Sequence, residues 1–218
     1  MRTATLGVAA CLLAALAGSL AGCTSMTRMS ADAPANVNLA GTWKLDPKSS
    51  TDTRKALDDL MKAARRTPGP RARAGGLGGY GSDAALLAPP PMVFAPDISL
   101  QKRLLAHGDW LKIVQKPDEV VISDGDSSRS FVPGERSVVS VPGGVADQRT
   151  GWKGREYWIV LKPQAGPTAT ETFKLSAGGM QLIETIEIGR DGRIPSLKVT
   201  RVYSPTQEEP PSAVPSQD

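Results

Sequence analysis

Two glutamates and one arginine on three successive predicted strands have the types and spacing to form a charged cluster inside an apolar wall. Side chains alternate between the two faces of a strand. One face of each of the first two strands therefore carries a single carboxylate among apolar residues: Ala169, Glu171, Phe173 and Leu175 on one strand, and Met180, Leu182, Glu184, Ile186 and Ile188 on the next.

The predicted turns bring these charges together. A tight turn at Ala177-Gly178 places Glu171 directly opposite Glu184, and the following hairpin places Arg201 opposite Leu182 and diagonal to Glu184. Like charges directly opposite each other are destabilising unless something compensates for them. An arginine between two carboxylates provides that compensation.

Three interpretations of the cluster stay open. The charges could anchor the head group of a small amphiphile inside an apolar interior. The two carboxylates could do acid–base work with their pKa values pushed apart. The cluster could also be a satisfied structural network, or a register slip by one residue could turn the glutamates to water. The candidate ligand-binding residues are Trp43, Tyr157, Glu171, Phe173, Glu184 and Arg201.

The sequence lacks the residues that several common catalytic and metal-binding sites require. His107 is the one histidine, and the two cysteines are Cys11 and Cys23. If the first is cleaved off and the second is acylated, no Cys-His triad and no His/Cys zinc site is available. His107 precedes Gly108-Asp109 and is expected in a solvated turn rather than in a Ser-His-Asp triad. No phosphate loop or dinucleotide fingerprint occurs, and Asp124-Gly-Asp126 has too few further ligands for calcium and favours a turn. We therefore expect a non-enzymatic protein with no cofactor and no metal.

The elements that must position the cluster are mostly strands. A first strand is expected at 39–45 and one short helix at 52–66, where Leu57, Leu60, Met61 and Ala64 share one face. Short strands separated by turn signals follow at 110–116, 119–124, 129–132, 137–141, 155–162, 168–175, 180–188 and 194–203. This pattern predicts an all-β fold, an antiparallel meander closing into a barrel with one short helix after the first strand.

Two segments have an amino-acid composition typical of disordered chain. Residues 67–97 are rich in Gly and Pro and are expected to form a disordered insert, and 204–218 a disordered polar tail.

The stretch from Arg54 to Arg73 holds seven basic residues against two aspartates. It could contact anionic lipid or lipopolysaccharide phosphates, or it could be a solvated helix face. We expect any envelope protein or anionic lipid partner to bind through 54–96. The net charge of +4 gives no argument for nucleic acid.

The N-terminus carries an export signal. Met1-Arg2 is followed by an apolar run from Leu6 to Ala17 and then by Leu20-Ala21-Gly22-Cys23. These four residues resemble the lipobox of bacterial lipoproteins. The resemblance implies that 1–22 is a signal peptide, that Cys23 is the acylated mature N-terminus, and that 23–37 is a tether. Because Thr24 follows the cysteine, we expect sorting to the outer membrane, facing the periplasm.

Gly41-Thr42-Trp43 on the first strand resembles the Gly-x-Trp signature of the lipocalin–calycin barrels. The resemblance implies a lipocalin-like barrel built from 38–66 and 98–203, in which Trp43 closes the base and Arg201 on the last strand packs on it. The pattern Gly41-Thr-Trp-Lys-Leu45 followed by Lys48-Ser49 also resembles a large group of uncharacterised exported bacterial proteins.

Three functions are therefore considered. The first is a lipid-anchored, non-enzymatic protein that binds a small apolar or amphiphilic ligand. The second is an interaction or structural lipoprotein of the cell envelope with a filled barrel. The third, an enzyme using Glu171 and Glu184, has the least support. A filled interior would favour the second function over the first.

Overall fold

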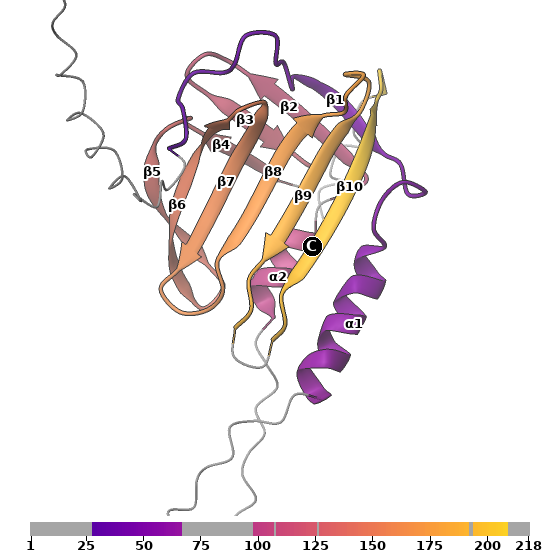
Figure 1. The fold of residues 1–218 in the computed structure, drawn as a ribbon, viewed down its shortest axis with the longest axis vertical. Helices are drawn as coiled ribbons and strands as arrows, with labels where there is room; N and C mark the ends of the chain where they lie inside the picture. The colour runs from indigo at the N-terminus through magenta and orange to yellow at the C-terminus, as the bar shows by residue number, and fades with distance from the viewer. Residues whose placement is uncertain (1–27, 67–97, 107, 126, 192–193, 209–218) are drawn as a thin grey trace, which may run out of the picture.

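The structure is a computed structural model, and it describes residues 28–66, 98–106, 108–125, 127–191 and 194–208. The expected signal peptide, Cys23, the 67–97 insert and most of the 204–218 tail lie outside the described residues. Figure 1 shows one curled sheet with two helices beside it.

Ten antiparallel strands form one sheet in the order β4-β3-β2-β1-β10-β9-β8-β7-β6-β5. The all-β meander predicted from the sequence is therefore confirmed. The strands are β1 (Gly41–Leu45), β2 (Trp110–Gln115), β3 (Val120–Ser123), β4 (Ser128–Phe131), β5 (Arg136–Val141), β6 (Gly144–Lys153), β7 (Glu156–Pro163), β8 (Ala169–Leu175), β9 (Leu182–Ile188) and β10 (Leu197–Pro205).

The sequence analysis missed β6. Its sequence, GVADQRTGWK, is largely polar and shows no simple alternation. The strand forms because both of its neighbours, β5 and β7, pair along it.

The expected closed barrel is wrong in one respect: the described sheet is a half-barrel whose outer strands, β4 and β5, do not pair with each other. After the four-residue β4 the chain turns, and the Gly134 N–H donates to the Thr150 carbonyl of β6 at 2.8 Å. The chain is thus tied to β6 before β5 begins. The sheet curls so that β2–β4 face β7–β10 (Figure 1).

Two helices, rather than the one expected, lie between β1 and β2: α1 (Thr53–Arg66) and α2 (Ser99–Leu105). The prediction of α1 is confirmed, and the Asp52 carboxylate caps it by accepting the Lys55 N–H at 3.0 Å. The seven-residue α2 was not predicted from the sequence. No helix among the described residues is both long and apolar enough to cross a membrane.

The helix α2 fills one end of the half-barrel. Leu100, Leu104 and Leu105 are buried against apolar side chains from the inner face. The sheet side of this second core cluster consists of Ala146, Leu161, Ala169, Ile186, Ile188 and Val199.

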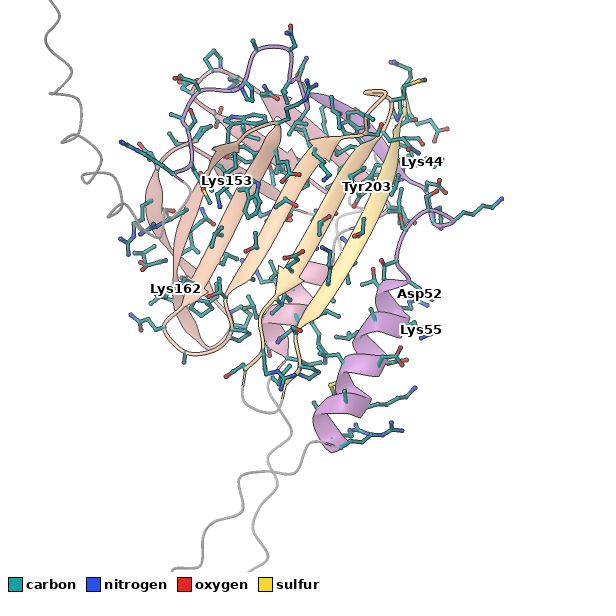
Figure 2. The ribbon with its side chains drawn as sticks, viewed as in Figure 1. Lys44, Asp52, Lys55, Lys153, Lys162 and Tyr203 are labelled. Atoms are coloured by element: carbon teal, nitrogen blue, oxygen red, sulfur yellow. The ribbon has the colours of Figure 1, made fainter. Side chains whose placement is uncertain are left out.

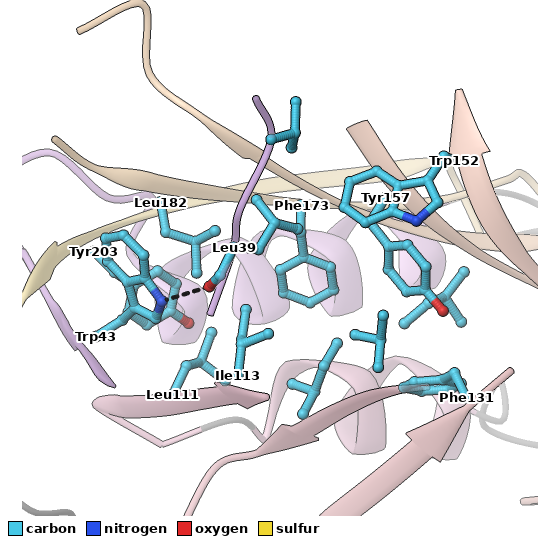
Figure 3. Close-up of a cluster of buried hydrophobic side chains, with 14 residues drawn as sticks. Leu39, Trp43, Leu111, Ile113, Phe131, Trp152, Tyr157, Phe173, Leu182 and Tyr203 are labelled. Carbon is cyan, nitrogen blue, oxygen red and sulfur yellow. Dashed lines mark hydrogen bonds between the residues drawn. The ribbon is translucent and has the colours of Figure 1, made fainter. Parts of the chain in front are cut away.

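A strap, residues 28–40, covers the opposite end of the half-barrel (Figure 1). Ser30 and Trp152 exchange two backbone hydrogen bonds of 2.9 Å. Farther along, Val37 and Leu39 are buried, and the Leu39 carbonyl accepts a 3.1 Å hydrogen bond from the Trp43 indole (Figure 3). Much of the stretch expected to be a tether is therefore packed on the domain.

The strap packs closely against Gly151, so a substitution at this position can measure how much the strap contributes to stability. A Cβ on Gly151 would lie 2.7 Å from the Ser30 carbonyl oxygen, whereas one on Gly144 would meet nothing within 4 Å; the φ angles are similar, 149° and 143°. Both alanine variants carry the backbone strain of positive φ, so their difference reports the clashes at Gly151. The two shortest of these are with the strap, at Ser30 and Met29, and a third is with the Gly134 nitrogen at 3.1 Å. We expect Gly151→Ala to lose about 2 kcal/mol more unfolding free energy in urea than Gly144→Ala. Equal losses would mean that the strap does not dock there.

Candidate functional site

A charged layer lies across the middle of the inner face, between two apolar clusters. Glu171 on β8, Glu184 on β9 and Arg201 on β10 are all buried, at 3%, 0% and 3% exposed. As predicted, they share the inner face with Tyr157 and Phe173, which are fully buried. On one side of the layer lies the cluster under the strap and on the other the cluster around α2.

The predicted pairing within the layer is wrong by two residues. Glu171 lies opposite Ile186 rather than Glu184, and Arg201 lies directly opposite Glu184 rather than Leu182. Between β8 and β9 the cause is a four-residue turn in place of the expected two-residue turn: the Ser176 N–H donates to the Gln181 carbonyl at 2.9 Å. Between β9 and β10, Asp191 pairs with Ile194, whereas the prediction paired 190 with 193. A shift of two residues keeps every side chain on its face.

Glu184 is held by two side chains of the last strand. The Tyr203 hydroxyl donates to Glu184 Oε2 at 2.8 Å, and Arg201 Nη1 lies 3.6 Å from the same oxygen. Burial, followed by the Glu184 charge, raises the pKa of the Tyr203 phenol. The hydroxyl therefore stays protonated and remains a donor to the carboxylate.

Arg201 also ties both helices to the sheet. Its Nη2 donates to the Leu105 carbonyl, at the last residue of α2, at 2.6 Å. The same nitrogen lies 3.4 Å from the Thr53 hydroxyl at the start of α1. A cation at a helix C-terminus interacts favourably with the unpaired carbonyls and the helix dipole.

The partner of Glu171 is Arg129 on β4, which the sequence analysis missed. Two hydrogen bonds of 2.8 Å, Nη1 to Oε2 and Nη2 to Oε1, join the guanidinium to the carboxylate across the interior. Burial opposes the charge of Arg129, but the Glu171 carboxylate outweighs burial and raises its pKa. The available signal was alternation in β4, which places Arg129 on the same face as buried Phe131.

The four charges of the layer compensate each other. Each buried carboxylate has its own guanidinium, so the layer holds two negative and two positive charges. The repulsion between Glu171 and Glu184 that the acid–base interpretation needed is offset. This arrangement fits the structural network among the three interpretations.

The interior around the layer is filled with side chains. Tyr157, Phe173, Leu182 and Tyr203 from one wall are fully buried and share a cluster with Leu111 from the other wall (Figure 3). Two hollows on the described surface, of about 500 and 240 Å³, are lined by other residues. The six expected ligand-binding residues therefore form packed core rather than the wall of an open pocket.

Three buried polar atoms in the described part of the chain lack a hydrogen-bond partner: Gln101 Oε1, Tyr157 Oη and Arg201 Nη1. Burial raises the pKa of Tyr157 to about 12. Unpaired buried groups are costly, so these atoms mark where a polar molecule would be stabilised if the interior opened.

Trp43 and Arg201 do not make the contact that the lipocalin resemblance implied. Trp43 is buried, pairs with Leu111 and Pro205 on the neighbouring strands, and donates to Leu39. Arg201 is engaged by Glu184 and α2. Among the described residues no group of three or more His, Cys, Asp or Glu side chains could hold a metal ion.

No protein-family model matches the chain, and no curated protein matches it in sequence. Similar solved structures include a REP1-NXSQ fatty acid transporter (16% identity, TM-score 0.44, covering 78% of this chain and 98% of that one). Two others are apo lipid binding protein 8 of Caenorhabditis elegans (14%, 0.45, 79% and 100%) and zebrafish ileal bile acid-binding protein complexed with cholic acid (15%, 0.40, 77% and 98%). The fold itself is a half-barrel of ten antiparallel strands with both helices between β1 and β2.

The charged layer predicts very different losses of stability when two glutamates on β9 are replaced. Glu184 is fully buried beside Arg201, whereas Glu187 is 54% exposed and pairs with Lys198 at the surface. Glu184→Gln leaves a buried guanidinium uncompensated, and we expect it to lose about 3 kcal/mol of unfolding free energy. The matched Glu187→Gln should lose less than about 1 kcal/mol. Urea unfolding of both variants measures this, and an unchanged or higher stability of Glu184→Gln would show that the layer holds unrelieved repulsion.

Proposed function

We propose that this chain is a non-enzymatic lipoprotein of the cell envelope whose filled half-barrel is a rigid core and which acts through its outer surface. One observation carries the proposal: side chains from the two walls meet in the interior, and the charges buried there neutralise each other. Such an interior leaves no wall for a permanently bound ligand.

The proposal includes a lipid anchor at Cys23 on the outer membrane, facing the periplasm. It is supported by Leu20-Ala21-Gly22-Cys23 after the apolar run. Two or three acyl chains on the cysteine would hold the protein stably on its membrane.

A second candidate function is the binding of a small apolar or amphiphilic molecule inside the half-barrel. The Tyr157 hydroxyl and Arg201 Nη1 favour it, because neither atom makes a hydrogen bond within the described part of the chain and a polar head group could provide one to each. For this to happen, the strap or α2 must move away from the end that it covers.

Mass spectrometry of two forms of the protein tests these proposals. The full chain, extracted from membranes of an expressing bacterium, should show under denaturing conditions a covalent mass of two or three acyl chains. The chain from Thr24 onward keeps every described residue and should show, under native conditions, only its own mass after incubation with fatty acids and phospholipids.

Each part has its own control. Cys23→Ser should abolish the covalent mass, and a full chain without that mass would contradict the anchor. A stoichiometric bound lipid on the chain from Thr24 would contradict the filled core and establish the second candidate.

A further inference from the structure

The strap fixes which end of the domain lies near the membrane. Cys23 precedes Ser30 by seven residues, and Ser30 is hydrogen-bonded to Trp152 at the end of β6. Seven residues reach at most about 25 Å when fully extended. If Cys23 is acylated, the end of the half-barrel that holds Trp152 stays within that distance of the bilayer.

A hollow with basic residues lies at this end. It has a volume of about 500 Å³ and is lined by Lys153, Arg155, Glu156 and Lys174, together with Leu175, Ser176 and Ala177. Lys153 directly follows Trp152, so the hollow adjoins the point where the strap is attached. Figure 2 shows Lys153 at the strap end of the domain and Lys162 at the other.

The positive charge of the hollow is only partly compensated. Lys174 donates to the Glu156 carboxylate at 2.9 Å, and the Trp158 indole donates to the same carboxylate at 3.1 Å. Lys153 stacks over the Trp158 ring, with Nζ 3.9 Å from its centre, and Arg155 is exposed. Three cations against one anion leave an excess of two positive charges beside an aromatic ring.

An exposed apolar residue projects beside the hollow. Met180 is 73% exposed, the highest exposure among the large hydrophobic side chains of the described residues. It ends the turn that begins with Ala177, one of the residues that line the hollow. An apolar tip flanked by cations is the arrangement that binds the boundary between head groups and acyl chains of an anionic membrane.

We propose that Lys153, Arg155, Lys174 and Met180, here called the basic end, form a surface that binds the phosphate head groups of an anionic membrane. The proposal rests on the proposed lipid anchor, which would hold this surface close to its own bilayer. Lys153 and Arg155 contact phosphates, the Lys174–Glu156 pair holds the hollow's rim, and Met180 enters the outer acyl region.

The basic end differs from the surface expected from the sequence. The described part of the basic stretch, residues 54–66, lies along α1, and α1 sits at the end of the half-barrel opposite the strap (Figure 1). Within α1, Lys55 and Lys62 are already close to Asp59, at 2.7 and 3.9 Å. The two surfaces cannot both face one flat membrane, so they can be told apart by mutation.

The experiment is co-sedimentation of the unlipidated chain from Thr24 onward with vesicles, either of phosphatidylcholine alone or with phosphatidylglycerol added. We expect association with the anionic vesicles only, weakened by added salt. At about fivefold in affinity for each cation near the surface, Lys153→Gln/Arg155→Gln should weaken association about 30-fold. Met180→Ser should weaken it about fivefold, since the apolar contact is lost.

Two matched variants serve as controls. Lys102→Gln/Lys162→Gln removes the same charge from exposed positions away from the strap and should leave association within twofold of the unaltered chain. Arg54→Gln/Arg65→Gln removes charge from α1 and should behave like that control. Circular dichroism of each variant confirms that the fold is kept.

Three outcomes would overturn the proposal: no association of the unlipidated chain with anionic vesicles, equal losses in the basic-end and control variants, or a loss confined to the α1 variant. These outcomes leave the covalent lipid mass and the native mass of the domain untouched. Failure of the basic end is therefore distinguishable from failure of the proposed anchor or of the filled core.

Discussion

The contacts of Arg201 hold the fold together. One guanidinium lies beside Glu184 on the neighbouring strand and donates to the last carbonyl of α2 and toward the start of α1. This one side chain therefore links both helices to the last strand. A buried charge that is paired and hydrogen-bonded in this way has little freedom to move without a large loss of stability.

The second ion pair explains why the interior is filled. Arg129 reaches Glu171 across the half-barrel and joins the short wall of β2–β4 to the long wall of β7–β10. The strands β3 and β4 have only four residues each, so each spans about 13 Å. Side chains from such short strands meet those of the opposite wall, and α2 and the strap close the two ends.

The sequence predicted on which face of its strand each side chain lies more accurately than it predicted which residues pair across strands. Strand alternation placed Tyr157, Glu171, Phe173, Glu184 and Arg201 on one buried face, and that placement survives a register shift of two residues because the period of a strand is also two. The register itself depended on the length of a turn. Two adjacent glycines, Gly178 and Gly179, allow both a two-residue and a four-residue turn, and only Gly179 has positive φ.

Features that depend on distant parts of the chain were not predictable from local pattern. The partner of Glu171 lies 42 residues away, and the contact exists only because the sheet curls. The polar β6 is a strand because both neighbours pair with it. The seven residues of α2 make only about two turns, too few for a clear helical period. The strap consists mostly of small and polar residues, and its two buried residues, Val37 and Leu39, gave a signal that fits a strand equally well.

The filled, charge-neutral interior is tested most directly by a double-mutant cycle between Arg129 and Glu171. The unfolding free energies of Arg129→Met, Glu171→Gln and the double variant give the coupling between the two walls. The packed structure predicts a coupling of about 2 kcal/mol, because the pair is bidentate and one partner is almost completely buried. A coupling near zero would mean that water separates the walls, and it would contradict the filled core.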